Sequence, residues 1–474
     1  MPTTTSQTDT LTLEAEQNWD TYGVGGTCTY NTQNLFVGDV DGDGVSEILT
    51  GGFSYYLANG TRISMQAPLK VWTWNGQNVT LKASTSWNGT IYCLSAIDLN
   101  KDGTVEIICG GTFANETGKL WGSLRVLNLI DGQLNLKAHY EGVPVNSLFV
   151  SDVDGDGVDD LLTVSQYRVN SSQQLSMWHL QENSLTLVER FSLAEANVTS
   201  SNSVFASDVD NDGEAEIMVA GYSDSLENSK GLLSIWHLND GKLALEALSK
   251  WQLAEGTAKT IAGGNQGNTA VNVVKAADLD ADGKEEIVTA GFSYDGSNVN
   301  AQIKVWNYIN GELVEKTSQE WASDYMTEAK CIALNDVNGD GKVEIVESGI
   351  TAAKDSFNNP EGVHDRGQLR VWFFNKTDLI LLASKDWTFD EGSCAWNVGN
   401  GDVDEDGVVE IVTVGCSALL GNCDPDMRIW SLPFEPLADS NYLPISTVTI
   451  TIVLVGLVSV FYIYQRRAKE SNST

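Results

Sequence analysis

A short acidic motif recurs seven times along the chain, and this repetition constrains the fold more than any other feature of the sequence. Successive copies begin 59, 54, 56, 70, 58 and 66 residues apart. Each copy has an apolar segment before the motif, a second after it, a third that usually contains Trp, and a fourth beyond a turn. Four antiparallel strands per repeat are typical of a propeller, so the sequence predicts an all-β, seven-bladed β-propeller. The motifs begin at Asp39, Asp98, Asp152, Asp208, Asp278, Asp336 and Asp402.

The two ends of the repeat region predict how the propeller closes. The seventh repeat stops after its third strand, at residues 427–432, whereas residues 11–19 have the sequence of a fourth strand. We therefore expect the N-terminal strand to complete the last blade, which closes the ring and leaves no free sheet edge. The predicted propeller domain spans residues 11–434.

Aromatic residues recur at two fixed places in the repeat. One place is the middle of the third strand, where the second repeat has Leu127, and the other is the end of the fourth strand. Such a ring could be a sugar-stacking platform, but side chains repeated in every blade more often pack between blades, and we expect that role. The third-strand residues are Trp72, Trp178, Trp236, Trp306, Trp372 and Trp430. The fourth-strand residues are Trp19, Trp87, Tyr140, Phe191, Trp251, Trp321 and Trp387.

Each acidic motif is a nine-residue loop with Asp, Asn or Glu at positions 1, 3, 5 and 9 and Gly at position 6. Calcium prefers six to eight oxygen ligands at about 2.3–2.6 Å, and a tight loop can direct several oxygens at one cation. The sequence thus predicts up to seven Ca²⁺ sites, each with the position-7 carbonyl as a further ligand, unless some loops serve only as turns. The predicted side-chain ligands are Asp39, Asp41, Asp43 and Glu47 in loop 1; Asp98, Asn100, Asp102 and Glu106 in loop 2; Asp152, Asp154, Asp156 and Asp160 in loop 3; Asp208, Asp210, Asp212 and Glu216 in loop 4; Asp278, Asp280, Asp282 and Glu286 in loop 5; Asp336, Asn338, Asp340 and Glu344 in loop 6; and Asp402, Asp404, Asp406 and Glu410 in loop 7.

The loops begin like an EF-hand but differ from it at position 12. An EF-hand needs a bidentate Glu there, and only loop 6, with Glu347, has one. Strand-like segments flank the loops in place of helices. The position-12 residues are Thr50, Cys109, Thr163, Val219, Thr289, Glu347 and Thr413.

The repeated loop resembles that of the FG-GAP or VCBS repeat family, whose calcium-loaded propellers include the head of integrin α subunits. The resemblance covers residues 11–434 and is carried by the Asp-x-Asp-x-Asp-Gly-x-x-Glu pattern. The family's Phe-Gly and Gly-Ala-Pro signature is reduced to Gly-Gly-Phe, Ala-Gly-Tyr or Ala-Gly-Phe after the second strand. The resemblance implies structural calcium. It does not imply integrin-type pairing, because nothing like the integrin leg domains or inserted domain is present.

Residues 443–464 form a 22-residue run without a charged side chain, long enough for a transmembrane helix. Arg466, Arg467 and Lys469 follow it, and no basic residue closely precedes it. The positive-inside rule then predicts a single-pass cell-membrane protein, with the propeller outside and residues 465–474 in the cytoplasm. Residues 435–442 are the expected linker. On the expected strand directions, the loop face lies towards the membrane and the opposite face is presented outward.

The N-terminus shows no signal peptide, so either a signal is missing or removed, or the propeller is cytoplasmic on a tail anchor. Eight Asn-x-Ser/Thr sequons favour the first reading and predict a glycoprotein. Cys416 and Cys423 flank a short loop and could form a disulfide. The formal net charge of −36 argues against nucleic-acid partners.

Catalytic motifs are not evident: the chain has four histidines and no GxSxG, HExxH or phosphate-binding glycine loop. His364, in a long loop, is the one histidine with catalytic possibilities, and a solvated role is the more common one. The sequence therefore favours an adhesion or ligand-binding module for a glycan or surface protein on the outward face. A membrane-anchored polysaccharide lyase or hydrolase is the alternative, and a structural surface-layer component is the third.

Overall fold

A computed structural model describes residues 11–19, 27–58, 61–114, 118–142, 145–165, 174–223, 229–253, 258–259, 265–266, 268–322, 326–352, 365–388, 393–419 and 422–432. All of them belong to the first of two compact units, Met1–Pro433. Within these ranges the protein is all-β, and the one helical segment is the short 3-10 helix η1 (Ala194–Ala196). No helix there has the length and apolar character needed to cross a membrane. The predicted linker 435–442, span 443–464 and tail 465–474 lie outside the described residues.

Most strands lie in four-stranded sheets and eight lie in one larger sheet, and we label successive sets of four strands as blades 1 to 7 in chain order. Blade 1 is β2 (Thr27–Gly38), β3 (Glu47–Ala58), β4 (Thr61–Trp74) and β5 (Val79–Trp87); blade 2 is β6 (Gly89–Ile97), β7 (Glu106–Ala114), β8 (Leu120–Ile130) and β9 (Gln133–Glu141). Blade 3 is β10 (Ser147–Ser151), β11 (Asp160–Ser165), β12 (Gln174–Gln181) and β13 (Ser184–Ser192); blade 4 is β14 (Val198–Ser207), β15 (Glu216–Ser223), β16 (Lys230–Asn239) and β17 (Lys242–Trp251). Blade 5 is β20 (Thr269–Ala277), β21 (Glu286–Tyr294), β22 (Val299–Ile309) and β23 (Glu312–Trp321); blade 6 is β24 (Met326–Asn335), β25 (Glu344–Ala352), β26 (Arg366–Phe374) and β27 (Leu379–Trp387). Blade 7 is β28 (Ser393–Gly401), β29 (Glu410–Leu419), β30 (Asn422–Ser431) and β1 (Thr12–Asn18).

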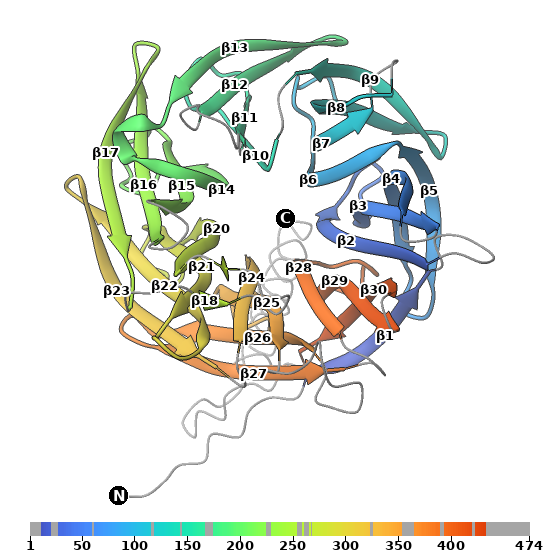
Figure 1. Ribbon diagram of the computed structural model, residues 1–474. Coiled ribbons are helices and arrows are strands. Elements are labelled where there is room, and N and C mark those ends of the chain that lie inside the picture. The colour runs from blue at the N-terminus through green and yellow to red at the C-terminus, as the bar shows by residue number, and fades with distance from the viewer. Residues whose placement is uncertain are drawn as a thin grey trace, which may run out of the picture. The chain divides into compact units, whose positions relative to one another are not determined.

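Blades 5 and 6 are joined in one eight-stranded sheet, because Val299 of β22 pairs in parallel with Met326 of β24. The other five blades are separate four-stranded sheets, and β18 (Ala258–Lys259) pairs with β19 (Asn265–Gln266) apart from them. The sheets follow one another around a ring (Figure 1). The first strand of each blade faces the centre and the fourth lies at the rim. The loops between first and second strands therefore lie on one face of the ring.

The predicted closure by the N-terminal strand is confirmed. β1 pairs antiparallel with β30, in a register that runs from Thr12 opposite Ser431 to Asn18 opposite Asp426. The Arg428 guanidinium, itself buried, donates to the Glu16 carboxylate at 2.9 Å across this pair. Two strands more than 400 residues apart in the sequence therefore complete one blade.

The aromatic residues pack between neighbouring blades, as predicted. The ring centroids of Trp251 in blade 4 and Trp306 in blade 5 are 5.2 Å apart, and the next pairs around the ring have the same geometry. Trp19, directly after β1, packs on Trp72 of blade 1 at 4.9 Å, so the stacking continues across the closure. In blade 2, where Leu127 replaces Trp, Trp87 packs on Phe113 instead. Such contacts add to the burial of large apolar surfaces and hold the blades in register.

The fourth strand of each blade has a one-residue β-bulge at the same place. In blade 1, for example, Trp72 pairs with Leu81 and Val71 with Ala83, which leaves Lys82 unpaired between them. A bulge breaks the alternation of side chains and re-aims the extra residue. The bulged residues of blades 1 to 7 are Lys82, Lys137, Val188, Glu246, Lys316, Leu382 and Glu14.

Candidate metal centres

The seven acidic loops all join the first strand of a blade to the second, so they lie on one face of the ring, as the sequence predicts. Position 1 organises each loop by accepting hydrogen bonds from its backbone. In loop 1, the Asp39 carboxylate accepts from the N–H groups of Gly42 at 2.7 Å and Gly44 at 2.9 Å. Asp43 at position 5 accepts from the N–H of Val45 at 2.9 Å, and this bond lowers its pKa. These hydrogen bonds from the backbone thus hold the acidic side chains towards the interior of the loop.

The acid at position 9 opens the second strand and is buried in all seven blades. One of its oxygens accepts the backbone N–H of position 2 at 3.0–3.1 Å in every loop. The second oxygen faces the other acids of the loop. Burial raises the pKa of Glu216 to about 7 and that of Glu344 to about 8, with further contributions from neighbouring aspartates. These carboxylates are therefore costly to ionise unless a cation lies beside them.

The residue at position 12 points away from the loop, which excludes an EF-hand geometry. Thr50 accepts a hydrogen bond from the indole of Trp72 at 2.9 Å, and the equivalent Thr–Trp pairs of blades 3, 5 and 7 are 2.9–3.0 Å long. Glu347 of loop 6 is wholly buried and accepts from the Gln368 amide at 3.1 Å. The position-12 side chain thus bonds to residues of the core and is not a ligand of the cation.

Loops 1 and 2 each contain a lysine ammonium. Lys82 Nζ lies 2.7 Å from Asp41 Oδ2, 2.7 Å from Glu47 Oε1 and 3.4 Å from Asp43 Oδ2. Burial alone would lower the pKa of Lys82, but the hydrogen bonds that its ammonium donates to Asp41 and Glu47 outweigh it and raise that pKa. In loop 2, Lys137 makes the corresponding contacts, and its hydrogen bond lowers the pKa of Asp102 to about 2.

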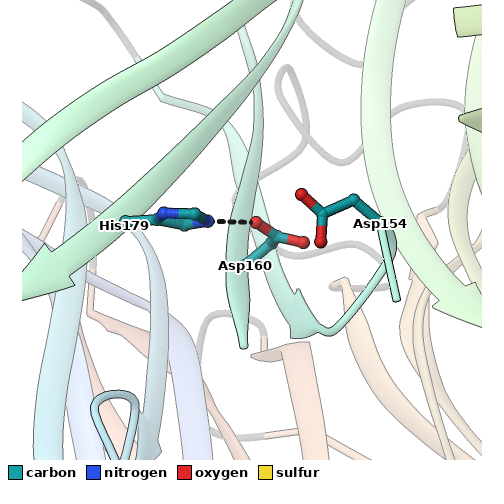
Figure 2. Close-up of side chains that lie close together, drawn as sticks. All are labelled: Asp154, Asp160 and His179. Carbon is teal, nitrogen blue, oxygen red and sulfur yellow. Dashed lines mark hydrogen bonds and ion pairs between the residues drawn. The ribbon is translucent and has the colours of Figure 1, made fainter. Parts of the chain in front are cut away.

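Loop 3 has a histidine in the corresponding space. Figure 2 shows the His179 ring pointing at Asp160, with Nε2 2.7 Å from Oδ1, while Asp154 approaches from the loop. Asp154, Asp160 and His179 can bring one ligand atom each within 4.8 Å of one another. Imidazole with two carboxylates is a ligand set that suits a transition metal as well as calcium.

Loop 4 has no lysine ammonium among its described contacts. Asp208, Asp210 and Glu216 converge within 4.8 Å, and Asp210 Oδ1 is buried without a hydrogen-bond partner. Burial raises the pKa of Asp210, and the nearby acids, including the bulged Glu246, raise it further. His237 contacts Glu214 at position 7, outside the predicted side-chain ligands.

Loop 7 resembles loop 4. Asp402 Oδ1 is buried without a hydrogen-bond partner, and burial raises the pKa of Glu410 to about 7. The bulged Glu14, from the other end of the chain, raises the pKa of Asp404 further, after the effect of burial.

Loops 5 and 6 carry amides beside the position-9 acid. In loop 5, Asn307 donates to Glu286 Oε1 at 2.9 Å, and Asp280 Oδ1 is buried without a hydrogen-bond partner. The ammonium of the exposed Lys376 lies 3.7 Å from this oxygen. In loop 6, Asn338 donates to Glu344 Oε1 at 3.2 Å.

The donor set fits calcium best in loops 4 and 7, where Asp210 Oδ1 and Asp402 Oδ1 are buried without a hydrogen-bond partner. Asp41 Oδ1 of loop 1 is buried in the same way, but the other oxygen of that carboxylate pairs with Lys82. A buried carboxylate oxygen with no hydrogen-bond partner costs free energy, and a hard divalent cation would satisfy it. Three or more of the predicted acids lie close together in loops 1, 3, 4 and 5. Sequence reasoning missed the residues that face them from the third and fourth strands, such as Lys82, His179 and Glu246, because no local pattern marks them.

A central cavity of about 540 Å³ is lined by the first strands of all seven blades. Asn34, Asn202 and Asn272 each donate a side-chain N–H to a backbone carbonyl of the following blade at 2.8–2.9 Å. On the blade 6 and 7 side, Lys330 lies 5.0 Å from the Trp396 ring centroid and pairs with Glu328. The indole N–H of Trp396 is buried without a hydrogen-bond partner.

The predicted disulfide is only partly described. Cys416 is disulfide-bonded, and the side chain of its predicted partner Cys423 lies outside the described residues. Cys93, Cys109, Cys331 and Cys394 are free thiols. His364, the predicted catalytic candidate, also lies outside them.

Comparison with known proteins identifies an FG-GAP-like repeat at residues 152–219, which include loops 3 and 4. No curated protein sequence matches the chain. The structure is similar to those of exotype rhamnogalacturonan lyase YesX (TM-score 0.46, 14% identity, 89% of this chain and 75% of that chain) and Bacillus licheniformis rhamnogalacturonan lyase PL11 (0.42, 15%, 85% and 72%). It is also similar to the Dos1 propeller (0.44, 12%, 86% and 83%). These similarities are too low to bear on function.

Proposed function

We propose that this protein is a calcium-stabilised, seven-bladed β-propeller of the FG-GAP/VCBS type that binds a glycan or a protein at a cell surface. The blade count takes the eight-stranded sheet as two blades. The observation that carries the calcium proposal is the buried carboxylate oxygen without a hydrogen-bond partner in loop 4, Asp210 Oδ1, and in loop 7, Asp402 Oδ1. Bound calcium would supply the positive charge that these acids lack.

The acids hold the cation in three ways. Position 1 shapes the loop through its backbone hydrogen bonds, as Asp39 does in loop 1. Position 5 supplies a carboxylate on the solvent side, position 3 supplies a carboxylate or an amide oxygen, and position 9 supplies a carboxylate from the buried side. Because the position-9 acid begins the second strand of the blade, a cation there would tie the loop to the sheet.

Calcium content and melting temperature test the calcium proposal. We expect purified protein to retain calcium after dialysis and to melt at a lower temperature in chelator than in millimolar calcium. Magnesium at the same ionic strength is the control, because the irregular loop oxygens suit the larger ion. A protein that holds no calcium and melts identically in both buffers would contradict the proposal.

The central cavity supports the binding proposal. Its volume is within the ~300–1,000 Å³ typical of ligand sites, and Trp396 and Lys330 are the aromatic and cationic groups that bind sugars or acidic peptides. The unpartnered indole N–H of Trp396 could donate to a ligand oxygen. The ligand proposed is one rich in hydrogen-bond acceptors.

A glycan array and a panel of surface proteins, each probed with calcium and with chelator, test binding. We expect retention of a defined ligand, lost in the Lys330→Met and Trp396→Ala variants. Lys119→Met and Trp121→Ala are matched controls, because this pair has a similar ring contact, 4.2 Å, outside the cavity. Binding that survives both cavity variants would exclude the cavity, and release of new saccharide ends would favour the lyase or hydrolase alternative.

Surface display rests on two features of the sequence and one of the structure. Residues 443–464 have the length and flanking charges of a membrane span. The four sequon asparagines whose side chains are described are all exposed, as glycosylation requires. Protease accessibility of the propeller on intact cells tests this proposal. The exposed sequon residues are Asn78, Asn88, Asn197 and Asn375.

A further inference from the structure

The seven loops have the same backbone pattern, but the type of side chain at the fourth-strand bulge varies among the blades. It is Lys in blades 1, 2 and 5, Glu in blades 4 and 7, and Val or Leu in blades 3 and 6. The contacts of these residues divide the loops into classes with different needs for a metal ion.

In loop 1 the lysine contacts the same oxygens that a metal ion would need. Lys82 Nζ is 2.7 Å from oxygens of both Asp41 and Glu47, at positions 3 and 9, and reaches Asp43 at position 5. Calcium would lie about 2.3–2.6 Å from these atoms. The ammonium nitrogen thus occupies nearly the position of the ion.

Loop 2 repeats this arrangement with a different lysine. Lys137 Nζ lies 2.6 Å from Glu106 Oε1 and 3.1 Å from Asp102 Oδ2, again at positions 9 and 5. Position 3 is the uncharged Asn100, so this loop has three carboxylates in place of four. One ammonium therefore offsets a larger share of the charge in loop 2.

A divalent cation and the lysine cannot share the loop. Both need the same carboxylate oxygens, and two positive charges a few ångströms apart repel each other strongly where water is excluded. Binding a metal ion would require the half-buried lysine to leave, and the ion pairs with Glu47 or Glu106 to break.

The bulged residues of the other blades make no such contact. Glu246 and Glu14 add negative charge near Asp210 and Asp404. Lys316 is exposed and has no ion pair within the described part of the chain. A lysine at the bulge is therefore not sufficient to fill a loop; it must also reach the acids.

We propose that Lys82 and Lys137 are built-in cations that take the place of calcium in loops 1 and 2. At most five of the seven loops, those of blades 3 to 7, then bind metal ions. The proposal rests on the proposed calcium function for those five loops. It also means that blades 1 and 2, two of the seven, keep their loops ordered without calcium.

The calcium stoichiometry of the full-length protein tests this proposal, with elemental analysis after dialysis as the readout. We expect no more than five ions in the wild type and two more in the Lys82→Met, Lys137→Met double variant. Methionine keeps an unbranched stem but removes the charge. The double variant should also melt at a lower temperature than wild type in chelator, and calcium should restore most of this loss. Lys316→Met, on the equivalent bulge of blade 5, should change neither quantity.

A reciprocal variant keeps the test decisive if the double variant does not fold. Glu246→Lys puts an ammonium on the bulge of blade 4 and should remove one bound ion, whereas Glu246→Gln should not. Seven ions in the wild type, or an unchanged count in the double variant, would overturn the proposal and leave the calcium function intact. No bound calcium in any variant would instead refute the proposed function.

Discussion

At the scale of single residues, the position-9 acid of each loop belongs to both the cation site and the backbone. One carboxylate oxygen accepts the N–H of position 2, and the other faces the loop. Removal of the whole side chain therefore leaves a buried donor unsatisfied, in addition to removing a ligand. The two effects can be separated by choosing the replacement.

Glu216 of loop 4 offers this separation. Glu216→Gln keeps an acceptor for the Val209 N–H but removes the charge, so we expect one calcium fewer and a fold that is nearly as stable in chelator. Glu216→Ala leaves that N–H unsatisfied and should cost about 1–3 kcal/mol more in the free energy of unfolding. Urea denaturation in chelator measures the difference, and equal stability of the two variants would contradict this account.

The buried Glu347 should make the stability of the folded protein depend on pH, independently of the acidic loops. It is wholly buried, and burial raises its pKa to about 8, against the opposing effects of Arg370 and Gln368. The folded state therefore holds a proton that the unfolded state releases near its ordinary pKa of 4.5. The stabilisation from this proton is complete below pH 4.5 and is lost as the pH rises through about 8.

The Glu347→Gln variant removes this titration. We expect its melting temperature to match that of the wild type near pH 4.5 and to exceed it by a growing margin up to pH 8, because glutamine mimics the protonated acid at every pH. Thermal scans at several pH values in chelator measure the margin. A margin that does not change with pH would show that Glu347 is ionised in the folded protein.

At the scale of elements, the fourth strand of each blade does more than finish a sheet. In blades 1, 2, 4 and 7 its bulge places one side chain beside the acidic loop of the same blade. Its terminal aromatic residue packs on the next blade, as Trp251 does on Trp306. In blade 7 this strand is β1, so residues 11–19 contribute Glu14 beside loop 7 and Trp19 against Trp72.

Removal of β1 should therefore open the ring. A chain that begins at residue 20 exposes the hydrogen-bonding edge of β30 and leaves Arg428 without Glu16, so we expect a lower melting temperature and self-association. A peptide of residues 11–19 added in trans should restore the melting temperature, and the same residues in scrambled order should not. A truncated chain as stable as the intact one would show that the closure contributes little.

At the scale of the whole molecule, hydrogen bonds link neighbouring loops on the loop face of the ring. The Lys101 ammonium of loop 2 donates to the Gly157 carbonyl of loop 3 at 2.9 Å, and the Asn211 amide of loop 4 donates to the Gly283 carbonyl of loop 5 at 2.6 Å. A cation that orders one loop can thus help to order the next. With the inter-blade aromatic pairs, these links favour cooperative unfolding of the ring.

Calcium should add substantially to the stability of this ring. At free calcium ten times the dissociation constant, each site contributes about 1.4 kcal/mol, so five independent sites contribute about 7 kcal/mol. This is comparable to the stability of a whole domain. We expect the melting temperature to rise with calcium concentration and to do so more steeply than a single site allows, as calorimetry at several concentrations would measure. A shift that one site explains would contradict the multi-site account.

The sequence alone determined the all-β fold, the places of the acidic loops, the inter-blade role of the aromatic residues and the closure by residues 11–19. Each of these follows from a local pattern that repeats, so comparison of the repeats locates it without knowledge of strand pairing. The alternation of apolar residues and the spacing of the acids are properties of short segments, and short segments form the same structure in every blade.

Only the tertiary structure decided what faces each loop. Lys82 follows Glu47 by 35 residues, and the two meet because the strands of blade 1 pair in one register with a bulge between Val71 and Trp72. A shift of one residue would turn Lys82 to the other face of the sheet. The acids could therefore be predicted as ligands from their spacing. Whether a lysine, a histidine or another acid lies beside them depends on pairing between distant strands, which no local pattern encodes.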